Sequence, residues 1–166
     1  MSAETRSPQR SYSYERPIAV TPEIAGLSGL ELIQRLVRGE LPAPSITATL
    51  DFRLVEVEKG RVVFEGDPGD FVLNPMGTVH GGYTATILDS ALGCAVHTMM
   101  PAGVSYTTVE LKVNYVRAMR PGDGAIRAEG TIIHAGGTLL TAEARMTRIA
   151  DGKLVAHATT TCMALK

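Results

Sequence analysis

Residues 74–93 read NPMGTVHGGYTATILDSALG, a polar loop containing glycines that runs into an apolar segment. From Ala85 onward, apolar residues recur at the spacing of an α-helix and occupy more than one of its sides. The stripe is formed by Ala85, Leu88, Leu92, Ala95 and Met99, and it is widened by Ile87, Ala91 and Val96. Because a helix that is apolar on most sides is buried, the pattern predicts one central buried helix over residues 81–99.

The segments on either side of this helix have the alternating apolar and polar pattern of β-strands. Before the helix, residues 46–66 contain two strand candidates joined by the turn Glu-Lys-Gly. After it come four further candidates, over residues 106–116, 125–134, 138–149 and 153–165. Short turns join the last of these strands, and such turns connect antiparallel neighbours. The sequence therefore predicts an α+β domain in which an antiparallel sheet of about five to six strands wraps around one helix.

Two of the strand candidates alternate clearly enough for their faces to be assigned. In residues 106–116, one face comprises Val109, Leu111, Val113 and Tyr115, and the other comprises Thr108, Glu110, Lys112 and Asn114. In residues 138–149, the inward face comprises Leu140, Ala142, Ala144 and Met146. Side chains alternate along a strand, so each apolar set is expected to lie on one face of the sheet.

The N-terminal region adds one shorter helix. Ser28 as N-cap and Glu31 three residues later have the spacing of a capping box, and Gly39 ends the helix. Residues 1–25 are rich in Ser, Pro and Arg and lack a clear period, which is typical of a flexible arm. We therefore predict a flexible arm over residues 1–25 and a single domain over residues 26–166.

Composition excludes several classes of protein. The 166 residues are 45% hydrophobic and 20% charged with a formal net charge of −1, as in an ordinary globular domain. There is no run of Lys or Arg that would bind nucleic acid. The N-terminus has no apolar leader, and no apolar run reaches the ~18 residues that span a bilayer. Cys94 and Cys162 are expected to be buried free thiols in a reducing cytoplasm.

The sequence also lacks the common patterns of metal and nucleophile sites. The histidines, at positions 80, 97, 134 and 157, have no ligand spacing, and neither cysteine belongs to a Cys-x-x-Cys pair. No Gly-x-Ser-x-Gly elbow occurs, and the turn at residues 66–70 is not followed by the Gly-Lys-Ser/Thr of a phosphate loop. We therefore expect no metal site and no serine hydrolase.

One carboxylate, Asp89, lies in the middle of the predicted apolar helix. A partly desolvated acid is costly unless a structural partner or a reaction requires it, and helix position alone leaves these two alternatives equal. His80, Gly81 and Gly82 open the same helix, where free N–H groups and the positive end of the helix dipole gather. Such a terminus can hold a phosphate or polarise a carbonyl oxygen that gains negative charge.

The spacing of these two features predicts a dimer. Gly81 and Asp89 are eight residues apart, which is ~12 Å along a helix, whereas both must come within ~3 Å of the reacting group. Two helices packed antiparallel about a two-fold axis can bring Asp89 of one copy to Gly81 of the other. The residues that share the face of Asp89 are mostly small and permit this approach: Gly82, Ala85, Thr86, Gly93 and Val96.

The stretch NPMGTVHGGYTATILD resembles the signature of the hotdog-fold thioesterases of the phenylacetate-degradation and 4-hydroxybenzoyl-coenzyme A type. The signature consists of an Asn, a His-Gly-Gly six residues later and an acid nine residues after the His. TTVELKVNYVRAMRPGD and GTLLTAEARMTRIADGKLVAHATTT also resemble this family, so that the resemblance covers about residues 46–165. It implies the hotdog fold and hydrolysis of an acyl-coenzyme A thioester to the free acid and coenzyme A. Coenzyme A then belongs to the substrate, and no cofactor is expected.

The resemblance implies roles for five catalytic residues. Asp89 would activate water or attack the thioester itself, and both routes stay open. The Gly81 amide would polarise the thioester carbonyl from the other subunit. Asn74 and His80 would orient the carbonyl or the water, and Thr108 would place a hydroxyl near the water.

Four further residues are implied as substrate contacts: Gly82 at the helix start, and Arg117, Gly137 and Thr138, the last three at the nucleotide of coenzyme A. The implied assembly is a homodimer and a dimer of dimers, although the sequence itself does not distinguish dimer from tetramer. Two alternatives remain, a non-catalytic protein that binds or senses acyl-coenzyme A and an enoyl-thioester hydratase on the same fold. The sequence leaves open whether the acyl group is aromatic or aliphatic.

Overall fold

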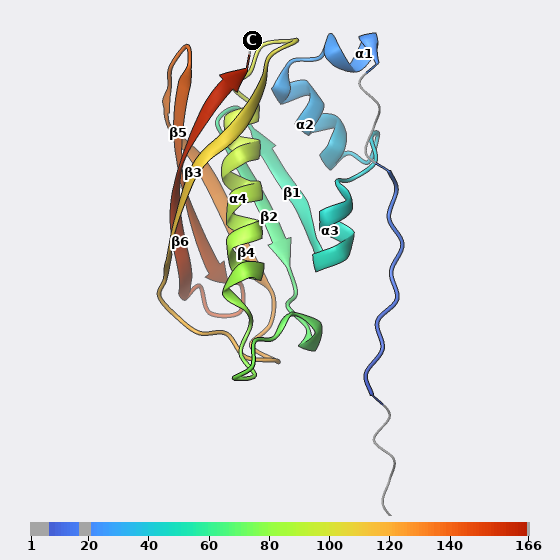
Figure 1. The fold of residues 1–166 in the computed structure, drawn as a ribbon, viewed down its shortest axis with the longest axis vertical. Coiled ribbons are helices and arrows are strands. Elements are labelled where there is room, and N and C mark those ends of the chain that lie inside the picture. The colour runs from blue at the N-terminus through green and yellow to red at the C-terminus, as the bar shows by residue number, and fades with distance from the viewer. Residues whose placement is uncertain (1–6, 17–20, 166) are drawn as a thin grey trace, which may run out of the picture.

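A six-stranded sheet packs against one long helix (Figure 1). The computed structural model describes residues 7–16 and 21–165. The helices are α1 (Pro22–Ala25), α2 (Gly29–Val37), α3 (Ser45–Leu50) and α4 (Gly81–His97), with a short 3-10 helix η1 (Asp70–Val72). The strands are β1 (Phe52–Glu58), β2 (Arg61–Gly66), β3 (Ser105–Tyr115), β4 (Ile126–Ala135), β5 (Leu139–Arg148) and β6 (Leu154–Leu165).

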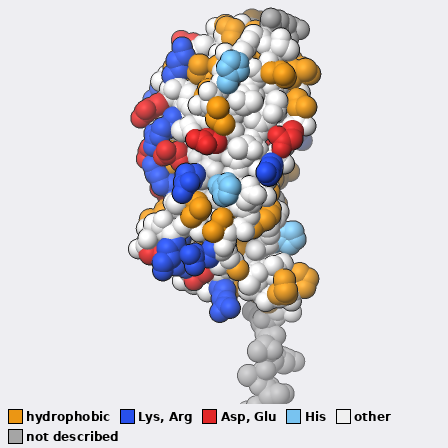
Figure 2. Space-filling model, turned by 90° about the vertical axis from the view of Figure 1, so that its left-hand side faces the viewer, with side chains coloured by type: hydrophobic (Ala, Val, Ile, Leu, Met, Phe, Trp, Pro, Cys, Tyr) orange, Lys and Arg blue, Asp and Glu red, His pale blue; other side chains and the backbone are white. Residues whose placement is uncertain are grey.

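The sheet is antiparallel throughout, with the strand order β1-β2-β4-β5-β6-β3. After β2 the chain runs through α4 and returns as β3 at the far edge, so α4 crosses one face of the sheet (Figure 1). On the opposite side of the sheet, groups of Lys, Arg, Asp and Glu side chains alternate with hydrophobic ones (Figure 2). The predicted α+β class, the strand number and the antiparallel pairing are confirmed.

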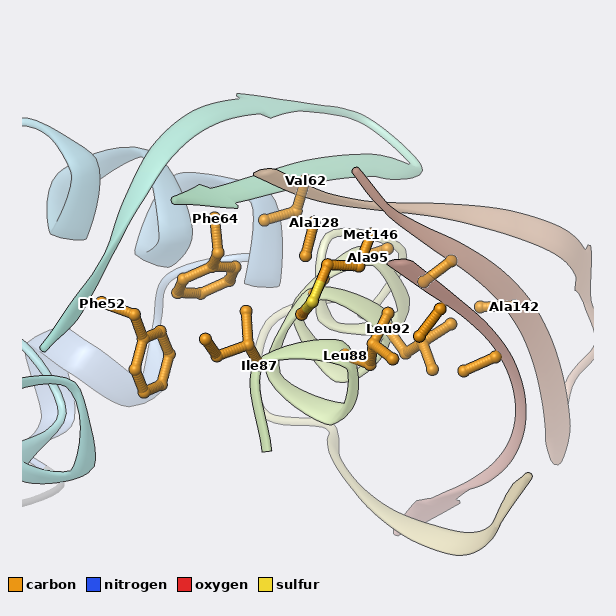
Figure 3. Packing of buried hydrophobic residues seen from close by; sticks show 14 of the residues in the cluster. Phe52, Val62, Phe64, Ile87, Leu88, Leu92, Ala95, Ala128, Ala142 and Met146 are labelled. Atoms are coloured by element: carbon orange, nitrogen blue, oxygen red, sulfur yellow. The ribbon is translucent and has the colours of Figure 1, made fainter. Parts of the chain in front are cut away.

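The core lies between α4 and the sheet, which bends around the helix (Figure 3). The apolar residues of α4 reach this core from several sides, and those without any exposed surface are Ile87, Leu88, Ala91, Leu92, Ala95 and Val96. The inward residues predicted for β5 are also buried: Leu140, Ala142, Ala144 and Met146. The sequence pattern therefore identified both surfaces of the core.

Helix α4 ends at His97, two residues before the predicted end at Met99. The Thr98 hydroxyl donates to the Ala95 carbonyl (2.7 Å) and accepts from the Gly60 amide (2.7 Å) in the β1–β2 turn. These bonds fix the helix end against the sheet.

The predicted capping box of α2 is present. The Glu31 amide donates to the Ser28 hydroxyl (3.3 Å), and the Ser28 amide donates to the Glu31 carboxylate (2.9 Å). Gly39 follows the helix with a φ of 71°, a conformation that favours glycine.

The prediction was wrong for residues 46–50, which were placed at the start of a strand but form most of helix α3. The Pro44 carbonyl accepts from both the amide (2.9 Å) and the hydroxyl (2.7 Å) of Thr47, which closes the first helical turn. Asp51 then adopts the left-handed conformation (φ 56°), so the helix stops and β1 starts at Phe52. These local bonds outweigh the short alternating pattern.

The predicted arm is described only in part, since residues 1–6 and 17–20 lie outside the described residues. Residues 7–16 form no helix or strand and are exposed, while Pro22–Ala25 form α1. Arg10 donates to the carbonyls of Thr49 (2.6 Å) and Ala48 (3.1 Å) near the end of α3. The flexibility of the arm and the boundary at residue 26 stay predictions.

The hydroxyl of Tyr83 is buried without a hydrogen-bond partner among the described residues. We expect Tyr83→Phe to raise the free energy of unfolding by about 1 kcal/mol, because it removes an unsatisfied polar group and keeps the ring. Denaturant unfolding measures the change, with Tyr14→Phe at an exposed position as the control. A destabilised Tyr83→Phe variant would show that the hydroxyl has a favourable partner.

Candidate active site

The N-terminus of α4 presents one free amide. His80 is the N-cap, and its Nδ1 accepts from the Gly82 amide (2.8 Å), which places the neutral ring's proton on Nε2. The Gly81 amide, at the first helical position, makes no hydrogen bond within the described part of the chain. The amide of Gly81 is therefore available to a ligand, whereas that of Gly82 is already used.

The loop before α4 is held by Asn74. Its Oδ1 accepts from the amides of Met76 (2.9 Å) and Thr78 (3.2 Å), and its Nδ2 donates to the Thr78 hydroxyl (2.8 Å). The carboxamide thus shapes the turn that leads to His80. A direct role of Asn74 in orienting the substrate or the water stays a prediction.

Asp89 and Thr108 meet, although they are 19 positions apart. The Thr108 hydroxyl donates to Asp89 Oδ1 (3.3 Å), and no bond to the second carboxylate oxygen is formed by any residue the structure describes. Burial raises the pKa of the half-buried Asp89, and the bond from Thr108 partly opposes this effect. A carboxylate with a raised pKa and one free oxygen is a stronger base than an exposed one.

A β-bulge turns Thr108 toward α4. Thr108 pairs with Cys162 in β6, but the next paired residue is Glu110, so Val109 is an extra residue in β3. Val109 is 59% exposed, while Leu111 contributes to the core. The predicted alternation, which grouped Val109 with Leu111 and put Thr108 on the other face, was therefore wrong on this side of the bulge.

Cys94 is a potential nucleophile on α4 near Asp89. Burial raises the pKa of its thiol to about 12, and the nearby Asp89 adds to this shift. The thiol therefore stays protonated near neutral pH, and Cys94 is inert as a nucleophile.

Gly81 lies at the far end of β3 from the Asp89–Thr108 pair. The Tyr115 hydroxyl donates to the Gly81 carbonyl (3.0 Å), a contact that no sequence signal indicated. Gly81 and Asp89 are eight residues apart on the straight helix, or ~12 Å. A single chain therefore does not bring the free amide and the carboxylate together, as predicted.

The predicted nucleotide contacts fall into two groups. Arg117 lines a cavity of about 250 Å³ together with Gly81 and Tyr115. Gly137 and Thr138 lie in the β4–β5 turn, where the Thr138 carbonyl accepts from the Ala164 amide (2.8 Å) at the opposite end of the sheet. Within one chain, Arg117 therefore lies beside Gly81. Gly137 and Thr138 lie at the other end of the sheet.

Within residues 7–16 and 21–165, His, Cys, Asp and Glu side chains form no group of three that could hold a metal ion. No helix in these ranges is long and apolar enough to cross a membrane.

One buried helix with a carboxylate on it, packed on a six-stranded antiparallel sheet, is the architecture of the hotdog thioesterases. The sequence model of the Thioesterase superfamily matches residues 76–155. A predicted esterase of Saccharolobus solfataricus is 34% identical over 116 residues, which are 70% of this chain and 80% of that protein. The chain belongs to the Thioesterase superfamily and is a thioester hydrolase.

Two further comparisons agree with this assignment. Human acyl-coenzyme A thioesterase 13 is 28% identical over 104 residues, covering 63% of this chain and 73% of that protein. The crystal structure of a phenylacetic acid degradation-related protein from Ralstonia eutropha JMP134 superimposes with a TM-score of 0.71 and 30% identity. That match covers 79% of this chain and 98% of the other. The hotdog fold and the family resemblance predicted from the sequence are confirmed.

The Asp89–Thr108 bond predicts a pH effect. If Asp89 is the base, kcat/KM falls as pH drops through its pKa. Since the Thr108 bond lowers that pKa, Thr108→Val is expected to raise it and to move the acidic limb of the kcat/KM profile to higher pH. Thr108→Ser keeps a hydroxyl and serves as the control. An acidic limb that stays in place in Thr108→Val would show that this carboxylate does not control the profile.

Proposed function

We propose that the protein hydrolyses an acyl-coenzyme A thioester to the free acid and coenzyme A, with Asp89 as the reacting carboxylate. The observation that carries this proposal is the half-buried carboxylate that accepts from Thr108 through one oxygen and keeps the other free. Binding alone gains nothing from a partly desolvated acid, which argues against a purely sensing role.

The reacting site is completed by a second copy of the chain. Strand β3 is an 11-residue edge strand, and its outer edge has no strand partner within the described ranges. Long unpaired edges are usually covered. Pairing of β3 with a second β3 about a two-fold axis would extend the sheet and set two α4 helices antiparallel. Asp89 would then face Gly81 of the partner subunit.

In this arrangement, Asp89 and the partner's Gly81 act on the proton and the negative charge that move during hydrolysis. The Asp89 carboxylate takes a proton from water while the water oxygen bonds to the thioester carbon. The amide of the partner's Gly81 donates to the carbonyl oxygen as it becomes negative, supported by the helix dipole. The carbon–sulfur bond then breaks, and the coenzyme A thiolate leaves and takes the proton from Asp89.

Direct attack by Asp89 is the second route. Its carboxylate oxygen would bond to the thioester carbon and expel the thiolate, and water would hydrolyse the resulting anhydride. Both routes use the same two groups. Entry of oxygen from labelled water into Asp89 during a single turnover occurs only by the anhydride route, when water attacks the Asp89 carbonyl of the anhydride.

The cavity beside Gly81 is proposed to receive the pantetheine arm and phosphates. Arg117 supplies a guanidinium there, and this group binds phosphate oxygens well. Gly137 and Thr138 would reach the same nucleotide only from the partner subunit's β4–β5 turn. His80, with its proton on Nε2, would donate near the carbonyl or the water.

A dimer of dimers in the cytoplasm is proposed as the working state. Apolar side chains lie exposed on the outer side of the sheet, where Leu139 on β5 pairs with Met163 on β6 and Leu165 follows (Figure 2). Such a patch suits contact between sheets. The free thiols Cys94 and Cys162 are consistent with a reducing compartment.

Release of free thiol from a panel of aromatic and aliphatic acyl-coenzyme A thioesters tests the proposal. We expect turnover with at least one of them and an acyl preference that defines the substrate. Binding of every thioester without thiol release would contradict hydrolysis and favour the sensing role.

A further inference from the structure

Gly93 gives the hydroxyl of Tyr106 access to α4. A Cβ at Gly93 would lie 2.6 Å from the Tyr106 hydroxyl oxygen and 3.4 Å from two ring carbons. Two atoms do not approach to 2.6 Å without a hydrogen bond, so any side chain at this buried position would displace the hydroxyl. Glycine at position 93 therefore leaves the space that the Tyr106 hydroxyl occupies.

The Tyr106–Gly93 contact lies next to the Asp89–Thr108 contact. Gly93 follows Asp89 by one helical turn, or ~6 Å along α4. Tyr106 precedes Thr108 by two positions on β3, so both side chains lie on the face of the strand that meets α4. Between β3 and α4, the Tyr106 hydroxyl is thus the polar group next to the Asp89–Thr108 contact.

The ring of Tyr106 is packed, but its hydroxyl has no hydrogen-bond partner among the described residues. Its ring packs against the ring of His97, with 5.3 Å between the ring centroids. Its hydroxyl makes no hydrogen bond to any residue that the structure describes. Burial raises the pKa of Tyr106 well above its ordinary value, so the hydroxyl keeps its proton at working pH. The hydroxyl is therefore available to donate a hydrogen bond to a water molecule.

We propose that the Tyr106 hydroxyl is a positioning group that donates a hydrogen bond to the water activated by Asp89. This inference rests on the proposed function. The water gives one proton to the free oxygen of Asp89, accepts from Tyr106 on one lone pair and directs the other at the thioester carbon. Tyr106 transfers no proton, and its contribution is the orientation of the water.

Tyr106→Phe, assayed beside the wild type and Asp89→Asn, tests the inference. The ring and its contact with His97 are kept, so the melting temperature should stay near that of the wild type. We expect kcat to fall about tenfold or more while KM changes less than about twofold. The control, Tyr14→Phe, lies at an exposed position and should match the wild type. A wild-type kcat in Tyr106→Phe would overturn the inference alone, whereas full activity of Asp89→Asn would overturn the proposed function.

A second variant separates the hydroxyl from the ring. Tyr106→Phe removes the atom 2.6 Å from a Cβ at residue 93 and leaves ring carbons at 3.4 Å, which is van der Waals contact, so Gly93→Ser can place a hydroxyl there from the helix side. We expect Gly93→Ser to lower kcat in the wild-type background and to raise it about threefold or more in Tyr106→Phe. A folded double variant no more active than Tyr106→Phe would show that a hydroxyl at this place does not restore turnover and would overturn the inference.

Discussion

Asp89→Asn is expected to lower kcat at least about a thousandfold while leaving thioester affinity nearly unchanged. Asparagine has the shape of aspartate, and its oxygen can still accept from Thr108, so the helix and strand stay in register. The amide cannot accept the proton of a water molecule or attack a thioester. Free-thiol release measures turnover, and calorimetry with the same thioester measures binding.

Glu143→Gln is the matched control for this experiment. Glu143 is an exposed carboxylate on β5, where the neighbouring residues Ala142 and Ala144 are the ones that turn toward the core. The same loss of charge there should leave kcat within about twofold of the wild type. Normal turnover in Asp89→Asn would leave the carboxylate only a structural role and would remove it from the mechanism.

Gly81→Pro is expected to reduce kcat about a hundredfold to a thousandfold, the usual loss for one oxyanion donor. Proline replaces the amide proton, which the helix does not use at its first position, with a ring carbon. The preceding residue, His80, is extended (ψ 136°), as a residue before proline prefers. Helix α4 should therefore form as before, without a donor for the carbonyl oxygen.

Gly81→Ala isolates the effect of the donor from that of bulk. A Cβ at Gly81 would approach the ring of Tyr115 to 3.2 Å, so both substitutions push on the same side chain. Alanine keeps the amide proton, and its kcat should exceed that of the proline variant at least about tenfold. Equal losses in the two variants would attribute the effect to displacement of Tyr115.

Helix α4, the capping box of α2 and the inward face of β5 could be predicted because each depends on residues close in sequence. The distance argument for a shared site had the same basis, since the length of a helix between Gly81 and Asp89 follows from residue number alone. These features need no knowledge of distant contacts.

The remaining features depend on neighbours that are remote in sequence. The bulge at Val109 is visible only when β3 is paired with β6, and without it Thr108 would face away from Asp89. The contact between Tyr106 and Gly93 likewise joins two elements. Helix α3 is a different case. Its alternating sequence pattern predicted a strand, but local bonds to the Pro44 carbonyl stabilise a helix. Sequence periodicity carries no information on either kind of contact.

Mixed dimers test most directly whether the carboxylate and the amide come from different subunits. Asp89→Asn and Gly81→Pro protomers with different tags can be expressed together and the heterodimer purified. One of its two sites would then combine an intact Asp89 with an intact Gly81, and the other would carry both defects. The account predicts about half of the wild-type turnover per dimer, far above either parent. A heterodimer as inactive as its parents would mean that both groups act within one chain.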